Sequence, residues 1–479
     1  MNSLRFLSNK LHNTLLFIYI FNLVHRTIRI MQLKFILPIF TLKRFFLFLL
    51  PVLCTFLWLT SCHKLPVKTL VIISPHWDGI KREFSRAFGD WHEKNYHERV
   101  EIDWRDVGGA SDSLKYVISR FGTEAKGIGI DIFFGGGIDP FLELTREGLA
   151  EVYHPPESVM TGIPAEVAGL PIYDPEYHWF GAALSSFGIV ANDRVLRVVH
   201  LPEVKKWADL TNPLLQTWVG VGDPRNSGAV HLMYEIILQG YGWTKGWEIL
   251  YQIAGNVRSF EKNSSIVAKE AAYGNIAYAM TIDFYGLTQV SSTGTQNMHF
   301  ILPEDYTIVS PDGICMLKGA PNQTYAKRFI DFVLSENGQK LWMLPVGHPE
   351  GPAHFPIERL CVRPDLYDQA CDIWTITMNP FKIQTTLKYD AKIASRRWKL
   401  LNSFIGATMI DVHPELAAAW KNSKDNPERR AEFSKIFLTE NEALEILDTF
   451  NDKDAVQFRN AKNIEWQQMA QAKFRRLTR

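Results

Sequence analysis

The stretch Leu70-Val71-Ile72-Ile73-Ser74-Pro75-His76 decides the fold. Its four apolar, mostly β-branched residues predict a short buried strand, and the residues that follow predict a turn. Ile80, Phe84, Phe88 and Trp91 then recur at the spacing of one helix face. A buried strand that leads into an amphipathic helix is the first part of a βαβ unit, the building block of parallel sheets.

The same alternation of strand and helix continues along the chain. Apolar runs predict strands over residues 100–107 and 128–134, and helical periodicity predicts helices over residues 111–121 and 140–147. After an extended segment through Ile189-Val190, further strands are predicted over residues 219–221, 276–281, 300–302 and 313–317, and further helices over residues 227–240, from residue 243, over 264–273 and over 325–342. We therefore predict an α/β fold of two lobes with mainly parallel sheets.

The C-terminal hundred residues are predicted to be helical. Ala443, Leu444 and Leu447, for example, recur at helical spacing among acidic neighbours. The sequence leaves open what this extension packs against. The predicted division is residues 67–180 and 295–379 for the first lobe, 181–294 for the second lobe and 380–479 for the helical extension.

The N-terminal residues have the features of a bacterial secretion signal. Lys43-Arg44 precede an uncharged apolar run, and Leu59-Thr60-Ser61 stand directly before Cys62. This order is typical of a signal peptide with a lipobox, in which the thiol of the cysteine at the cleavage site carries the lipid. We therefore predict a signal segment over residues 1–61 and a lipid-anchored linker over 62–66, with an uncleaved membrane helix as the alternative.

Met31 begins a complete signal sequence by itself, so we hypothesise that residues 1–30 precede the true start. The first 61 residues hold seven Lys/Arg and no Asp/Glu, which leaves 45 basic against 51 acidic residues, a net charge of about −6, in the rest of the 479-residue chain. This mild acidity argues against nucleic acid as a partner. The 46% hydrophobic content is sufficient for more than one core.

Three of the five cysteines lie beyond the signal and the predicted anchor: Cys315, Cys361 and Cys371. None belongs to a CxxC pair of the kind that binds metals. A disulfide between Cys361 and Cys371 in an oxidising compartment and three unpaired thiols are both consistent with the sequence.

Residues 67–367 resemble the extracellular solute-binding family 1 proteins, in the ferric-iron, phosphosugar and phosphonate branch of type II periplasmic binding proteins. Each motif alone is weak, but their order and spacing make the resemblance specific. The motifs are Ser74-Pro75-His76, Gly108-Gly109-Ala110-Ser111, the strand end over residues 131–137, the segment over residues 223–228, Asn263-Ser264-Ser265 and the helix over residues 326–335.

The resemblance implies two α/β lobes joined by two crossover strands, which close over a ligand in the cleft between them. It also implies a monomeric receptor outside the cytoplasm that needs no cofactor, catalyses nothing and delivers its ligand to the membrane permease of an ABC importer. Iron-binding members carry two adjacent tyrosines as phenolate ligands, whereas residues 281–285 of this chain contain the single Tyr285. We therefore expect a small anionic solute, phosphorylated or phosphonate-like, with ferric iron held by His76, Asp283 and Tyr285 as the alternative.

The expected binding residues follow strands or begin helices. The carboxyl ends of strands and the N-termini of helices meet at one edge of an α/β lobe, where unpaired N–H groups and the helix dipole attract anions. A serine at a helix start also acts simply as an N-cap. The candidates for ligand contact are Ser74, His76, Ser111, Gly136, Gly137, Ser227, Gly228, Ser264, Ser265 and Asp283, with Arg225 as either an anion clamp or a solvated turn residue.

Other functions are less consistent with the sequence. A secreted enzyme would need an activated nucleophile or a metal-bound water, but the chain has no G-x-S-x-G elbow, no H-E-x-x-H pair and no Walker loop. His348, Glu350 and His354 are close enough to ligate a metal, but the interleaved prolines and glycine favour a loop. A sensor that reports the ligand to a membrane kinase cannot be separated from a transport receptor by sequence.

Overall fold

The computed structural model describes residues 67–369, 374–376, 378–383 and 385–479. The predicted signal segment, the Cys62 anchor, Met31 and Cys371 lie outside these residues. Cys315 and Cys361 are both buried. In the described part of the chain, we find no helix with the length and hydrophobicity needed to cross a bilayer.

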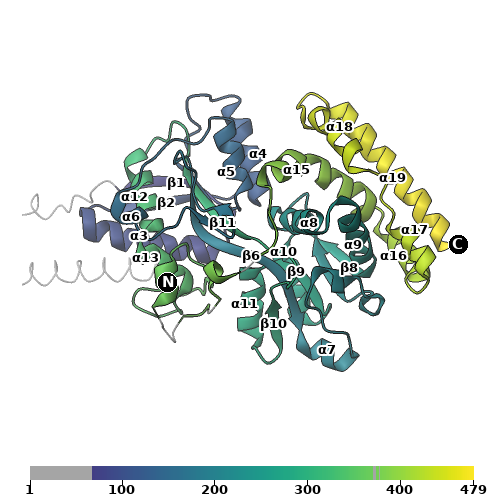
Figure 1. Ribbon diagram of the computed structural model, residues 1–479. Coiled ribbons are helices and arrows are strands. Elements are labelled where there is room, and N and C mark those ends of the chain that lie inside the picture. Colours follow the sequence, from purple (N-terminus) through teal and green to yellow (C-terminus); the bar gives the residue numbers. More distant parts are fainter. Residues whose placement is uncertain (1–66, 370–373, 377, 384) are drawn as a thin grey trace, which may run out of the picture. The chain divides into compact units, whose positions relative to one another are not determined.

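A mixed sheet runs through the unit formed by Val67–Arg479, as Figure 1 shows. Its strand order is β2-β1-β3-β11-β6-β9-β7-β8, with β10 paired to β6. Strand β1 is parallel to β2 and β3, and β7 is parallel to β8 and β9, as expected for βαβ units. The strands are β1 (Lys68–Ile73), β2 (Val100–Arg105), β3 (Ile132–Phe134), β6 (Phe180–Asn192), β7 (Val219–Gly222), β8 (Val257–Glu261), β9 (Tyr278–Ile282), β10 (Met298–Ile301) and β11 (Val309–Met316).

Strand β6 belongs to both lobes. All 13 of its residues are buried. Residues 180–186 pair with β11 in the first lobe, and residues 187–191 pair with β9 in the second. Leu184 packs in the first lobe's core, whereas Ile189 packs in the second lobe's core. This single strand therefore fixes the two halves of the sheet to one another.

Helices cover both faces of the first lobe's half of the sheet. Phe84, Phe88 and Phe329 pack on one face, and Val117 and Phe141 pack on the other. Small two-residue strands β4 (Glu166–Val167) and β5 (Leu170–Pro171) form a separate hairpin. The helices of this lobe are α3 (Asp78–Tyr96), α4 (Ala110–Phe121), α5 (Asp139–Arg146), α6 (Glu157–Met160), α12 (Gln323–Leu334), α13 (Glu336–Met343) and α14 (Pro364–Asp368).

The second lobe has the same plan. Residues of α8 and α9, such as Met233 and Trp247, pack on one face of its strands, and residues of α10 and α11, such as Val267 and Val290, pack on the other. Its helices are α7 (Asp193–Val199), η1 (Trp207–Thr211), η2 (Pro213–Leu215), α8 (Gly228–Tyr241), α9 (Trp243–Asn256), α10 (Ser264–Tyr273) and α11 (Asp283–Thr293).

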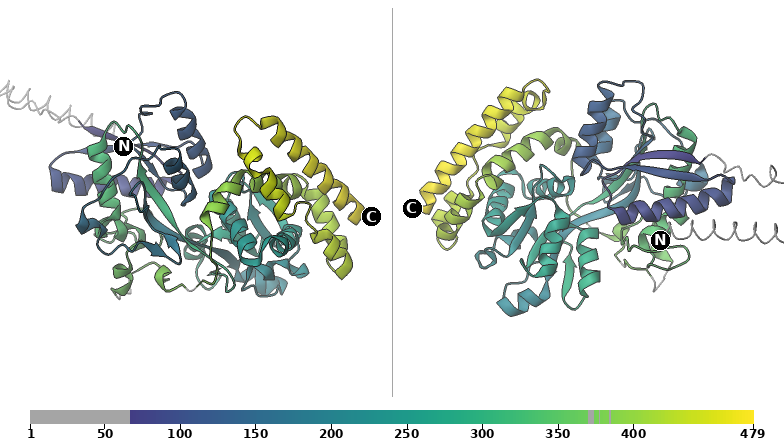
Figure 2. Two further views of the ribbon diagram at one scale, coloured as in Figure 1. Left: turned by 45° about the horizontal axis from the view of Figure 1, so that its top comes forward. Right: turned by 180° about the vertical axis from the view of Figure 1, so that it is seen from behind.

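The C-terminal extension packs on the second lobe, and Figure 2 shows its yellow-green and yellow helices beside the teal helices of that lobe. The two share one hydrophobic core. The ring of Phe404 lies 5.0 Å from that of Trp247 in α9 and 5.1 Å from that of Trp466. The extension consists of η3 (Pro380–Lys382), α15 (Ala391–Ile405), the π-helical turn η4 (Gly406–Ile410), α16 (His413–Ser423), α17 (Pro427–Ser434), α18 (Glu440–Asn451) and α19 (Val456–Thr478).

Three details differ from the prediction, and the first is strand β8, which was not predicted. The helix expected over residues 325–342 is two helices, α12 and α13, because Ser335 is extended and its hydroxyl caps the first turn of α13. Strand β10, assigned to the first lobe by the division at residue 295, pairs with the end of β6, and Met298 packs among second-lobe residues. The chain therefore returns to the first lobe only with β11.

Candidate solute-binding site

A cleft of about 340 Å³ lies between residues of the two lobes. This volume suits a small molecule. The first lobe lines it with the turn after β1, the start of α4 and the glycines after β3. The second lobe adds the starts of α8, α10 and α11. The lining residues are Pro75, His76, Trp77, Ile80, Asp106, Gly108, Gly109, Ala110, Asp112, Gly136, Gly137, Ser185, Phe187, Asn226, Ser227, Gly228, Ala229, Leu232, Lys262, Asn263, Ser264, Ile282, Phe284, Tyr285, Ser310, Pro311, Asp312 and Arg359.

Four helices, α4, α8, α10 and α11, begin at this cleft. The N-cap of α4 is Gly109, the N-cap of α8 is Ser227 and the N-cap of α10 is Asn263. No side chain caps the first turn of α4 or α8, whereas the Asn263 side chain accepts a hydrogen bond from the amide of Ile266. The first-turn amides of α4 and α8 thus bring unused donors and two positive helix-dipole ends to one cavity.

The two lobes approach closely beside these helix starts. A Cβ placed on Gly109 would lie 3.1 Å from the backbone oxygen of Asn226. On the same side, a Cβ placed on Gly228 would lie 3.9 Å from the backbone oxygen of Gly136. Glycine at these positions leaves space for the backbones of the two lobes to meet, so the helix starts face a common ligand volume.

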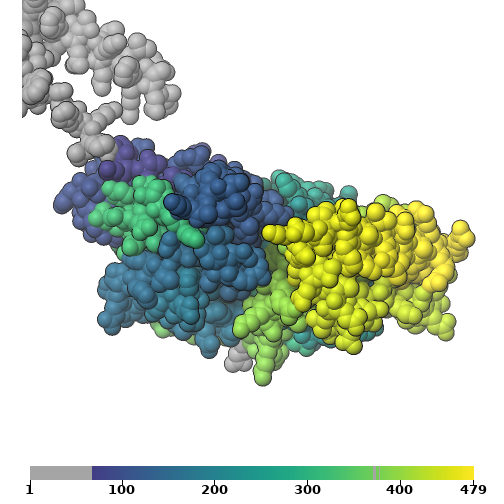
Figure 3. Space-filling model, turned by 90° about the horizontal axis from the view of Figure 1, so that it is seen from above, coloured from purple at the N-terminus to yellow at the C-terminus, as the bar shows by residue number. Residues whose placement is uncertain are grey.

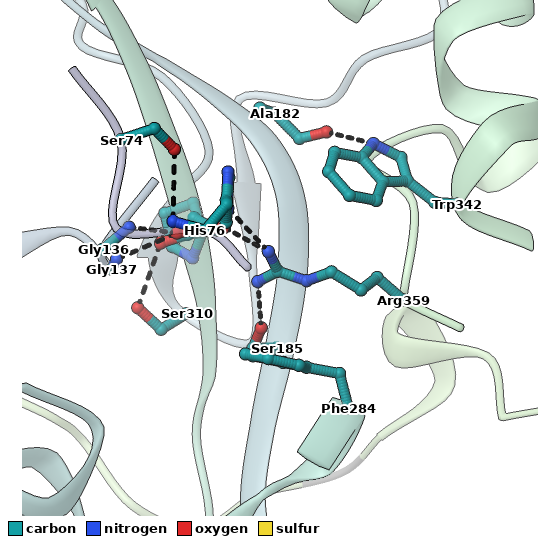
Figure 4. Close-up of polar contacts among 12 residues, drawn as sticks. Ser74, His76, Gly136, Gly137, Ala182, Ser185, Phe284, Ser310, Trp342 and Arg359 are labelled. Atoms are coloured by element: carbon teal, nitrogen blue, oxygen red, sulfur yellow. Dashed lines mark hydrogen bonds and ion pairs between the residues drawn. The ribbon is translucent and has the colours of Figure 1, made fainter. Parts of the chain in front are cut away.

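A buried ionic cluster lines the cleft on the side of the first lobe, and Figure 4 shows its polar contacts. One carboxylate oxygen of Asp312 contacts both Nε2 of His76, at 2.7 Å, and the guanidinium of Arg359. The other accepts hydrogen bonds from the amides of Gly136, at 2.5 Å, and Gly137, at 3.1 Å. Arg359 also donates to the hydroxyl of Ser185 at 2.9 Å.

Burial and charge act in opposite directions on this cluster. Burial alone would raise the pKa of Asp312, but the neighbouring Arg359 and His76 hold that pKa well below its usual range. Burial lowers the pKa of His76 despite its contact with Asp312. The Arg359 guanidinium packs 4.3 Å from the ring centre of Phe284 and 5.3 Å from that of Trp342. The arginine and aspartate charges therefore compensate one another before any ligand arrives.

Other polar groups at the cleft keep donor or acceptor capacity. Ser264 is buried, lines the cavity and has no hydrogen-bond partner for its hydroxyl among the described residues. His76 likewise has no described partner for Nδ1. Lys262 is exposed at the rim and contributes a positive charge. A buried polar atom without a partner is costly, so such groups suit contact with a polar ligand.

The structure brings many of the sequence-predicted residues to one cavity. They come from five separate segments of the chain, and they include the single tyrosine of the iron alternative. Those that line the cleft are His76, Gly136, Gly137, Ser227, Gly228, Ser264 and Tyr285.

Four predicted residues lie behind the cavity lining. The hydroxyl of Ser74 accepts a hydrogen bond from the amide of His76. Ser111 is buried in the first turn of α4, and Ser265 donates to the side chain of Asn263. The carboxylate of Asp283 is buried and accepts from the amide and hydroxyl of Ser186, which differs from the expected contact with ligand.

Sequence reasoning missed the centre of the site. Arg359 and Asp312 were not candidates, because their contact depends on how β11 and the segment after α13 fold back against β1. The pair of charged residues Glu358 and Arg359 inside the otherwise apolar run over residues 357–362 was the available signal for Arg359. Lys262, directly before the Asn263 motif, was also overlooked. Arg225, considered as an anion clamp, instead pairs with Asp223 and Asp411.

The two metal hypotheses find little support in the geometry. Within the described ranges, no three His, Cys, Asp or Glu side chains gather as a metal site would require. Glu350 pairs with Lys340. Burial raises the pKa of Tyr285 when no cation is bound.

Two lobes that share a sheet through β6 and enclose a cleft of helix starts define the fold of a periplasmic binding protein. Residues 146–359 match the family model described as bacterial extracellular solute-binding protein. The match includes the second lobe and ends at Arg359. The proteins it resembles are binding proteins rather than enzymes.

Individual relatives agree with this class. The phosphoglycerate transport regulatory protein PgtC of Salmonella typhimurium is 32% identical over 159 residues, which are 33% of this chain and 39% of the relative. The alignment thus spans about two fifths of that relative's length.

Solved structures show the shared fold. AfuA from Actinobacillus pleuropneumoniae, with exogenous fructose-6-phosphate bound, has a TM-score of 0.51 and 18% identity over 75% of this chain and 99% of its own. The apo ferric ion-binding protein A of Pasteurella haemolytica has a TM-score of 0.54 and 17% identity over 71% of this chain and 97% of its own.

Proposed function

We propose that the protein is the extracytoplasmic solute-binding component of an ABC importer and captures a small phosphorylated or phosphonate-like anion. The observation that carries this proposal is the convergence of the α4 and α8 N-termini, both without a side-chain cap, on one cleft. Several backbone N–H groups and two helix dipoles directed at one volume are the features that bind phosphate oxygens.

The charges of the cleft fit an anion with several oxygens. Because Arg359 is already neutralised by Asp312, the ligand's charge is met by helix amides and by Lys262 at the rim. The unpartnered hydroxyl of Ser264 supplies a further hydrogen-bond donor on the side of the second lobe. Such a set of neutral donors with one cation matches the distributed charge of a phosphate or phosphonate group.

The relatives favour the same ligand class. The name of one refers to phosphoglycerate, and the structure of another contains fructose-6-phosphate. Ferric iron is the alternative, because a third binds ferric ion. Two of the three residues expected to bind iron, His76, Asp283 and Tyr285, have other partners in this chain. His76 contacts Asp312, and Asp283 contacts Ser186. We therefore rank the organic anion first.

Isothermal titration and thermal unfolding test this ranking. We expect 3-phosphoglycerate or fructose 6-phosphate to raise the Tm, because a ligand at one hundred times its Kd stabilises the folded state by about 2.7 kcal/mol. Ferric citrate should produce no visible phenolate-to-iron absorption. A coloured ferric complex, together with no response to any phosphorylated compound, would reverse the ranking.

The location and the partner form part of the proposal. We propose that Cys62 is acylated after cleavage of residues 1–61, which would tether the receptor beside its permease. Labelling cells with an alkyne analogue of palmitate should mark the wild-type protein, whereas Cys62→Ser should lose the label. An equally labelled Cys62→Ser variant would contradict the anchor.

A sensor is the second candidate function, because the Salmonella relative is named as a transport regulatory protein. Deleting the gene in a strain that expresses the permease constitutively separates the roles. A transport receptor is needed for uptake of labelled 3-phosphoglycerate even then, whereas a sensor is not.

A further inference from the structure

The C-terminal extension lies against α8, whose first turn lines the cleft. In Figure 1, α15 lies between α5 of the first lobe and α8 of the second, and it contacts both. A Cβ placed on Gly228, the first residue of α8, would lie 3.3 Å from Cη2 of Trp398. One turn further, the rings of Trp398 and His231 are 3.9 Å apart.

Buried polar contacts fix this packing. Arg397 makes a two-pronged ion pair with Glu235 of α8, with N–O distances of 2.7 and 2.6 Å. Both side chains are buried. The side-chain oxygen of Asn402 accepts a hydrogen bond from Nδ1 of His231 at 2.7 Å. A bidentate arginine–carboxylate pair restrains direction as well as distance, so α15 and α8 move as one body.

A second contact holds the turn that precedes α8. The guanidinium of Arg225 pairs with Asp223, at 2.8 Å, and with Asp411 of the extension, at 3.0 Å. Gly406 gives this guanidinium space, because a Cβ there would lie 2.7 Å from Nη1. The turn that leads to the Ser227 N-cap is therefore bound to Asp411, the C-cap of η4, by a contact that does not involve α15.

We propose that the extension positions the anion-binding start of α8, with Trp398 and Asp411 as positioning residues. This inference rests on the proposed function. Trp398 packs against Gly228 and His231, and Gly228 also lines the cleft together with Ala229 and Leu232. No described residue of the extension lines the cleft, so the extension holds the first-turn amides of α8 in place without contacting the ligand.

The physical reason is preorganisation. The first turn of a helix has no amide hydrogen bonds of its own, so it frays unless neighbouring groups restrain it. A ligand that must order a frayed turn binds more weakly by the entropy of ordering it. Figure 3 shows the yellow and yellow-green atoms of the extension as one continuous surface.

Binding and amide exchange of four full-length variants test the proposal. Trp398→Ala removes the contact with Gly228, Trp398→Phe retains an aromatic ring, and Asp411→Asn removes the ion pair with Arg225 without changing shape. Phe458→Ala is the control, because Phe458 is a partly buried aromatic of the same extension that packs near Phe450. The probes are inorganic phosphate and 3-phosphoglycerate.

We expect Trp398→Ala to raise the Kd about tenfold and Asp411→Asn about threefold, with Trp398→Phe close to wild type. Hydrogen exchange of the amides of residues 228–230 should accelerate in the Trp398→Ala and Asp411→Asn variants but not in Phe458→Ala. If Trp398→Ala does not fold, Asp411→Asn decides the outcome. Unchanged Kd and exchange in the variants that fold would overturn the positioning role while the proposed function stands. Absence of binding by the wild type would instead overturn the proposed function, and the inference with it.

Discussion

A larger side chain at position 109 tests whether the ligand binds between closed lobes. Gly109 has φ −69° and ψ 177°, a conformation that any residue adopts, so a side chain there adds no backbone strain. A Cβ would lie 3.1 Å from the backbone oxygen of Asn226 on the opposite lobe. Alanine therefore needs a shift of a few tenths of an ångström, whereas the additional methyl groups of valine crowd the interface further.

The magnitude follows from the cost of overpacking, about 1 to 3 kcal/mol for added methyl groups in a packed region. This cost applies only when the lobes are closed. Since 1.4 kcal/mol is a factor of ten in affinity, we expect Gly109→Val to weaken binding about 5- to 150-fold. Gly109→Ala should be intermediate.

Isothermal titration with 3-phosphoglycerate measures the effect, and the Tm without ligand reports folding. Gly89→Ala is the matched control, because a Cβ there meets its nearest atom, the oxygen of Val100, only at 3.9 Å. Wild-type affinity in a folded Gly109→Val variant would refute the reasoning, since the lobes would then not need to meet at Asn226.

Three further predictions concern charges. Arg359→Met leaves the buried carboxylate of Asp312 without its main partner and should lower the free energy of unfolding by about 3 to 5 kcal/mol in urea titrations. Adding Asp312→Asn to this variant should recover part of the lost stability. A double variant that is no more stable than Arg359→Met alone would contradict the pairing. Burial, more than a neighbouring carboxylate, raises the pKa of Asp139 from 3.8 to about 7. Between about pH 4 and pH 7 the folded state therefore keeps a proton that the unfolded chain releases, and the folded state loses stability relative to the unfolded chain as the pH rises through this range. Asp139→Asn should therefore be more stable than wild type at pH 8, on the order of a few kcal/mol in denaturant titrations, with a smaller difference at pH 5; a difference that does not change with pH would count against this assignment. Lys262→Ala should weaken phosphate binding several-fold at low salt and less at high salt, while Lys269→Ala, an exposed lysine further along α10, should leave the Kd unchanged.

The βαβ units could be predicted because their signals are local. The apolar run before Ser74 and the helical spacing from Ile80 to Trp91 each depend on neighbouring residues, and both elements form where expected. The helix starts at Ser227 and Ser264 were visible for the same reason, since a capping residue before a periodic apolar segment is a short-range pattern.

The missing parts depend on contacts that are distant in sequence. Arg359 meets Asp312 and His76 only because three separate segments converge, and no spacing in the chain encodes that contact. Helix α12 ends at Ser335 because this serine caps the next helix, α13, although the helical spacing of apolar residues continues across it. The extension's support of α8 likewise joins residues more than 160 apart.

A crystal structure of the protein with 3-phosphoglycerate bound tests the central claim most directly. The account predicts phosphate oxygens within hydrogen-bond distance of first-turn amides of α4 and α8, with Lys262 turned toward them and Arg359 still paired with Asp312. A ligand held elsewhere on the molecule, or a cleft occupied by ferric iron coordinated by Tyr285, would contradict it.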